Sequence, residues 1–191
     1  MATNYLFLAI LCFSLAGSVR VPAVHLLAVD NTRSRFQQSD ASCRGALVRR
    51  AAAQVGIREK TGNNDGTRVE EYLAVAGLKK GAPYCSAFVS WVFKQEGFAQ
   101  PRTGWSPALF PVSRLARCAL PGNVFGVYFP EFKRIAHAGI IERVDGNWCI
   151  TIEANTSLQG GREGEGVFRK RRHIKMIYRM ADWVTPERGA K

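Results

Sequence analysis

The sequence lacks the ligand patterns of a metal or redox protein. It has 5 cysteines and 3 histidines among 191 residues, with no Cys-x-x-Cys pair and no histidine-rich stretch. A structural zinc site would have to gather Cys43, Cys85, Cys118 and Cys149 or His137 from distant parts of the chain, whereas zinc ligands usually come in closely spaced pairs. We therefore expect neither a metal nor another cofactor.

The sequence also lacks a hydrophobic run long enough to cross a bilayer comfortably. The apolar run 5–17 is short and is followed by small residues, as in a secretory signal, although no Lys or Arg precedes it. We expect residues 1–18 to be a signal peptide, with an uncleaved N-terminal anchor as the alternative. Either way we expect an exported protein, periplasmic or extracellular.

Acidic residues are scarce relative to basic ones. The chain has 27 Lys and Arg against 15 Asp and Glu, a formal net charge of +12. This excess favours an anionic partner. The basic run 169–173 would alternate between the two faces of a strand, so it does not present every charge to one ligand. Because aromatic and basic residues are not interleaved as in single-strand binders, we expect no nucleic-acid partner.

Length and pattern predict one α+β domain. The chain shows no internal repeat, and 47% hydrophobic content in 191 residues suits a single core. Helical patterns precede strand patterns, which favours helices packed on an antiparallel sheet. We expect helices at 46–59, 67–76 and 85–97, a loop-rich segment at 101–121 with a helical turn at 112–119, and strands at 123–129, 137–144, 148–155, 166–173 and 174–183. The domain would span 46–183, between an N-terminal extension at 19–45 and a tail at 184–191.

Cys85 is placed where a protein can make a thiol nucleophilic. It follows Pro83 at the expected start of a helix whose buried face includes Phe88 and Trp91. Unpaired N–H groups and the positive end of the helix dipole favour a thiolate there. The alternative is a small buried apolar residue, since free cysteine is often buried. If Cys85 stays free, at most one intramolecular disulfide can form among the exported cysteines Cys43, Cys118 and Cys149.

Segment 136–155 reads as two strands around an Asp-Gly turn, and it brings a histidine near a carboxylate and an amide. A three-residue loop 145–147 would pair Gly139 with Glu153 and His137 with Asn155, placing all four on one face. A two-residue loop would pair His137 with residue 154 and move Glu153 to the opposite face. A catalytic site therefore predicts the longer loop.

These residues together indicate nucleophilic acyl transfer. His137 would take the proton of Cys85 and later give it to the leaving amine, while Glu153 or Asn155 fixes the orientation of the imidazole. The backbone N–H of Cys85 would help to stabilise the oxyanion. Taken alone, His137 is better explained as a histidine that satisfies a loop hydrogen bond, and only the set of residues together favours catalysis.

Three motifs resemble the CHAP family, the cysteine- and histidine-dependent amidohydrolases and peptidases of bacterial cell walls. They are segment 83–89 (PYCSAFV), segment 136–139 (AHAG) and segment 153–155 (EAN), in a resemblance that extends over about 46–183. The family pattern has glycine where this chain has Ala136 and Ala154. The resemblance implies a papain-like fold, with Cys85 as nucleophile, His137 as base and acid, and Glu153 and Asn155 as orienting groups.

The resemblance implies a peptidoglycan hydrolase that cuts either the lactyl-alanine amide or a peptide bond of the stem or cross-bridge. Its basic charge would hold it near the anionic bacterial envelope, and we expect a monomer. Specificity would come from cleft residues such as Trp105, Phe110 or the Gly-rich stretch 61–66. The alternative is a non-catalytic basic module that binds the wall or another polyanion.

Overall fold

The computed structural model describes residues 23–157 and 164–186, with side chains from Gln38 onward. The expected signal peptide at 1–18 and residues 158–163 lie outside the described residues. The chain divides into a unit that ends at Phe36 and a unit that begins at Gln37, and the second holds the sheet and the site. No helix in the described ranges is both long and apolar enough for a membrane span.

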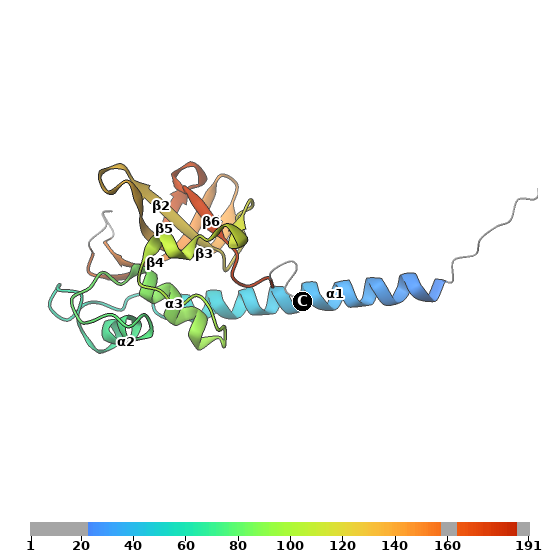
Figure 1. The fold of residues 1–191 in the computed structure, drawn as a ribbon, viewed down its shortest axis with the longest axis horizontal. Coiled ribbons are helices and arrows are strands. Elements are labelled where there is room, and N and C mark those ends of the chain that lie inside the picture. The colour runs from blue at the N-terminus through green and yellow to red at the C-terminus, as the bar shows by residue number, and fades with distance from the viewer. Residues whose placement is uncertain (1–22, 158–163, 187–191) are drawn as a thin grey trace, which may run out of the picture. The chain divides into compact units, whose positions relative to one another are not determined.

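The second unit is an α+β structure, as the pattern predicted (Figure 1). Its six-stranded antiparallel sheet has the order β1-β6-β2-β3-β4-β5. The strands are β1 (Leu115–Ala116), β2 (Val124–Phe129), β3 (Arg134–Asp145), β4 (Trp148–Thr156), β5 (Gly166–His173) and β6 (Arg179–Ala181). The helices are α1 (Ala23–Ala52), α2 (Thr67–Val75) and α3 (Cys85–Gln95), with short 3-10 turns at Ser106–Leu109, Val112–Arg114, Pro130–Phe132 and Ile174–Met176.

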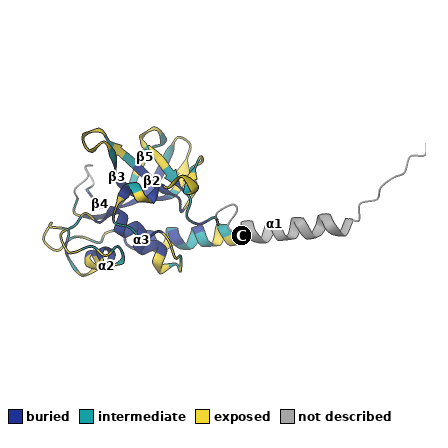
Figure 2. Cartoon of the chain, viewed as in Figure 1, coloured by how far each residue is buried: buried dark blue, intermediate teal, exposed yellow. Residues whose placement is uncertain are grey.

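Helix α3 is the centre of the core and packs against β3 and β4. All residues from Cys85 to Phe93 are buried, so α3 is dark blue in Figure 2. Tyr72 of α2 packs edge-on against Phe88 at 5.3 Å and Trp91 at 5.1 Å between ring centroids. Burial of each such side chain contributes roughly 1.5–3 kcal/mol. This packing fixes the start of α3 against the middle of the sheet.

Several expected element boundaries were wrong. The helix expected at 46–59 ends at Ala52, because turns occupy 53–56 and Gly56 has a φ of +95°. The strand expected at 174–183 is a 3-10 turn followed by the short β6. Helix α2 begins at Thr67 as expected, with Gly66 as its N-cap, and the Gly66 N–H donates to the Glu70 carboxylate at 3.3 Å.

The hairpin between β3 and β4 differs from the expected one and still reaches the expected register. Asp145 pairs with Trp148, so the loop has two residues and the prediction of a three-residue loop was wrong. A β-bulge at Glu142 then adds one residue to β3, and Gly139 pairs with Glu153 as predicted. His137 pairs with Val127 of β2, and no β3 partner is assigned to Asn155.

Candidate active site

Cys85 is the first residue of α3, and Tyr84 is the N-cap. Its side chain is buried with 5% exposure, and its Sγ lies 3.6 Å from Ser106 Oγ and 3.8 Å from Ser86 Oγ. The two hydroxyls lie 2.8 Å apart. The first N–H groups of a helix have no intrahelical acceptor, so the Cys85 amide is available to an oxyanion beside the thiol.

His137 lies on β3 and is 1% exposed. Its Nε2 lies 2.8 Å from Oε2 of Glu153. Glu153 lies on β4, where it pairs with Gly139 of β3. This fixes the imidazole with Nδ1 as the nitrogen left for the thiol. Nδ1 has no hydrogen-bond partner of good geometry among the described residues, although it lies close enough to the Cys85 thiol for the two groups to shift each other's pKa. Catalytic hydrogen bonds are often long before substrate binds.

Four hydrogen bonds hold the Glu153 carboxylate, which is fully buried. Oε1 accepts from Thr151 Oγ1 at 2.6 Å and from Arg172 Nε at 2.6 Å. Oε2 accepts from Arg172 Nη2 at 2.6 Å and from His137. Although burial raises the pKa of Glu153, its bonds to His137 and Arg172 hold that pKa well below its usual range. Glu153 is therefore an ionised group that orients the imidazole.

The environment reverses the usual order of the thiol and imidazole pKa values. Burial raises the pKa of Cys85, but His137 and the hydroxyls of Ser106 and Ser86 outweigh it and lower the pKa to about 7. Burial lowers the pKa of His137, but Cys85 and Glu153 outweigh it and raise the pKa to about 9. Between these values the pair exists as a thiolate beside an imidazolium, which is the nucleophilic form.

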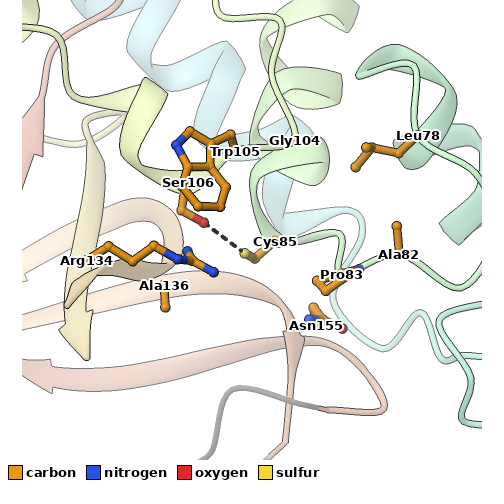
Figure 3. Close-up of a pocket in the computed structure, with 10 residues that line it drawn as sticks. All are labelled: Leu78, Ala82, Pro83, Cys85, Gly104, Trp105, Ser106, Arg134, Ala136 and Asn155. Atoms are coloured by element: carbon orange, nitrogen blue, oxygen red, sulfur yellow. Dashed lines mark hydrogen bonds between the residues drawn. The ribbon is translucent and has the colours of Figure 1, made fainter. Parts of the chain in front are cut away.

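A cavity of about 190 Å³ opens over the thiol (Figure 3). It is lined by Leu78, Ala82, Pro83, Cys85, Gly104, Trp105, Ser106, Arg134, Ala136 and Asn155. Asn155 lies at a β-bulge of β4 with a φ of +55°, a backbone conformation that asparagine tolerates better than most residues. It is brought to the cavity beside Cys85, whereas Glu153 is the residue that holds His137.

The structure shows how the chain accommodates Ala136 and Ala154 where the family pattern has glycine. Neither Ala136 nor Ala154 has a positive φ, so neither position requires glycine for its backbone conformation. Ala154 is buried in the core, and Ala136 places its methyl group in the cavity wall. The replacement therefore narrows the cavity rather than straining the strand.

Other residues singled out in the sequence fall in different places. Trp105 lines the cavity with 54% of its surface exposed, but Phe110 is buried in the core and the Gly-rich stretch lines a separate hollow with Arg58 and Glu165. That stretch supports the site indirectly. Glu59 accepts hydrogen bonds from the Asn64 backbone at 2.8 Å and from the hydroxyl of Tyr84 at 3.0 Å.

The remaining cysteines take no part in this arrangement. Cys43, Cys118 and Cys149 are free thiols, so no disulfide joins them in the described part of the chain. Cys149 is buried against Phe125 and Ile141, and burial raises the pKa of its thiol.

Sequence reasoning missed Arg172, Thr151 and Ser106. Arg172 belongs to the basic run at 169–173, where the pattern indicated only alternating charges. Its partner Glu153 lies on the neighbouring strand, and the pairing of Glu153 with Phe168 in β5 leaves Arg172 four residues away along the strand. Arg172 lies on the same face of its strand as Phe168, the cross-strand partner of Glu153, and this alternation was the available signal.

Comparison of the chain with protein-family models, with curated proteins and with solved structures finds no match.

Proposed function

We propose that the chain is a papain-like cysteine hydrolase that cleaves an amide bond of bacterial peptidoglycan. The observation that carries the proposal is that the Cys85 thiol lines a cavity and has its pKa lowered by His137, which the ionised Glu153 holds in place. A thiol at a helix start facing a histidine on an antiparallel sheet supports the papain-like arrangement. The motif resemblance and the net charge of +12 support the cell wall as substrate.

In the proposed reaction the Cys85 thiolate attacks the carbonyl carbon of the amide. The oxyanion that forms accepts a hydrogen bond from the Cys85 backbone N–H, and Asn155, at the cavity wall, lies where its amide contacts the substrate. The imidazolium of His137 gives its proton to the leaving amine, and a thioester remains. His137 then takes a proton from water, the hydroxide attacks the thioester, and the acid leaves as the thiolate re-forms.

The test is digestion of purified peptidoglycan under reducing conditions, with mass spectrometry of the released fragments. We expect release by the wild type and by Cys118→Ala, which removes an exposed cysteine, and none by Cys85→Ala. The new termini identify the bond as the lactyl-alanine amide or a peptide bond.

The rival function is a basic module that binds the wall without cutting it, and the positive charge favours it. If wild type and Cys85→Ala both sediment with the wall and neither releases fragments from several wall types, the binding module is the better account.

A further inference from the structure

We propose that Arg134, stacked on Trp105 at the cavity, binds a carboxylate of the substrate, so that the preferred substrate carries a free carboxylate close to the scissile amide. The inference rests on the proposed hydrolysis at Cys85 and adds the substrate class to it.

Arg134 is held in place by its surroundings. It begins β3, three residues before His137, and its guanidinium carbon lies 4.2 Å from the ring centroid of Trp105 and 5.7 Å from that of Phe132. Its Nη1 donates to the Ile135 carbonyl at 3.0 Å. Figure 3 shows the guanidinium directed toward the space between Ala136 and the Cys85 thiol. A guanidinium held by an aromatic face loses little entropy when it binds an anion.

The charge of Arg134 is not neutralised by the protein. Two other arginines that are largely buried pair with carboxylates: Arg44 with Asp182 at 2.5 Å, and Arg172 with Glu153 at 2.6 Å. The half-buried Arg102 donates instead to backbone carbonyls of its own loop and of α3. No carboxylate lies within ion-pair distance of Arg134 among the described residues. Arg134 is also the only arginine or lysine among the described residues that line the cavity. A planar guanidinium with free N–H groups matches a carboxylate.

The size of the cavity favours one carboxylate-bearing residue over a sugar chain. About 190 Å³ is smaller than the roughly 300–1,000 Å³ of typical small-molecule sites, so it admits about one amino-acid residue. The half-exposed Trp105 borders the cavity and stacks on the guanidinium of Arg134. A peptide residue with a free carboxylate thus satisfies both the volume and the charge.

The test compares purified muropeptides before and after conversion of their carboxylates to primary amides. For the wild type we expect amidation to raise KM about tenfold or more with a smaller change in kcat, because a charged hydrogen bond to the substrate is lost. Arg134→Gln should raise KM for the free acids to a similar extent and respond little to amidation, and Arg134→Lys should restore part of the preference. Arg143→Gln, an exposed arginine of the same strand, is the matched control.

Calorimetric binding of the same two muropeptide preparations to Cys85→Ala separates the two proposals. Tighter binding of the free acids, abolished by adding Arg134→Gln, supports the carboxylate site even if no turnover is seen. Equal binding and equal KM for both preparations overturn the carboxylate site while leaving hydrolysis intact. A lowered kcat in Arg134→Gln with the preference for acids retained overturns it as well.

Discussion

The pKa values of Cys85 and His137 decide which of the two side chains holds a proton near neutral pH, and the surrounding groups set those values. Glu153 and its ionic partner Arg172 are both removed from water, which is costly unless every hydrogen-bonding position is filled. The four hydrogen bonds on Glu153 meet that condition. The carboxylate consequently stays ionised and keeps the imidazole basic enough to hold the proton of the thiol.

This arrangement predicts the pH dependence of Cys85 reactivity. Alkylation of Cys85 by iodoacetamide, followed by peptide mass spectrometry, should rise with a midpoint at about 7. Hydrolysis should rise through the same range and fall through about 9, as His137 loses its proton. The two values belong to the coupled pair.

His137→Gln provides the control for that measurement, because it removes the cation that stabilises the thiolate. Its alkylation midpoint should move upward, since burial then acts with little opposition. A wild-type midpoint at the ordinary thiol value of about 8.5 would contradict the ion pair.

Among individual residues, sequence pattern was sufficient for those whose chemistry is local. Cys85 was found from helix-start signals, and His137 and Glu153 from strand alternation. Ser106 was not found, because it reaches the thiol from a loop segment that has no periodicity. Arg172 was missed because its role depends on a strand pairing that no local pattern specifies.

At the level of elements, the hairpin shows how two local deviations cancel. A two-residue loop alone would have turned Glu153 away from His137. The bulge at Glu142 restores the pairing of Gly139 with Glu153. The sequence predicted the correct register through the wrong loop, because an inserted residue inside a strand leaves no distinct signal in the hydrophobic alternation.

Gly139 lies where β3 and β4 approach too closely for a side chain. A Cβ there would lie 2.8 Å from the Ile152 carbonyl oxygen, 2.8 Å from Phe125 Cε1 and 3.0 Å from Glu153 Cγ. Because one of these atoms is backbone, the strands must separate to accept it. We expect Gly139→Ala to lower the free energy of unfolding in urea by about 1–3 kcal/mol.

The same variant should also raise the alkylation midpoint of Cys85, because movement of Glu153 weakens its hold on His137. Ala136→Gly is the comparison on the same strand: it removes a methyl group from the cavity wall and leaves Glu153 undisturbed. A Gly139→Ala protein with unchanged stability and unchanged midpoint would show that the contact is not restrictive.

At the scale of the molecule, buried ion pairs join segments that are distant in sequence. Arg44 of α1 donates to Asn123 at 2.8 Å, to Asp182 at 2.5 Å and to Thr185 at 3.0 Å. These bonds tie the end of α1 to the start of the sheet and to the C-terminal segment. Burial raises the pKa of Asp182, but hydrogen bonds from Thr185 and the Arg44 charge outweigh it and lower the pKa overall.

These groups predict a stability that is lost mainly in acid. Glu153 and Asp182 have lowered pKa values, so their contribution is present above the unfolded values of 4.5 and 3.8 and is lost as the pH falls below them. The raised pKa of His137 stabilises the folded state fully below pH 6.5, the unfolded value, and this contribution is lost as the pH rises through about 9. The lowered pKa of Cys85 adds stability from about 7 toward 9, so the two largely cancel.

Urea unfolding at several pH values checks this expectation. Glu153→Gln should lower the free energy of unfolding by about 3 kcal/mol near pH 7, because it leaves the largely buried Arg172 without its ionic partner, and it should weaken the loss of stability in acid. Glu131→Gln removes an exposed carboxylate and should leave both quantities nearly unchanged. Equal acid sensitivity in the two variants would locate the acid-labile group elsewhere.

Near neutral pH four side chains of the candidate site carry charges that sum to zero: the Cys85 thiolate and the Glu153 carboxylate against the His137 imidazolium and the Arg172 guanidinium. Dissolved ions screen exposed charges far more than buried ones. Salt should therefore leave the readiness of the nucleophile almost untouched and weaken only capture of the substrate, where Arg134 and the basic surface meet solvent. Under the proposed function, the rate of cleavage of bound substrate would be the same in dilute and in saline surroundings, and only binding to the wall would weaken with salt.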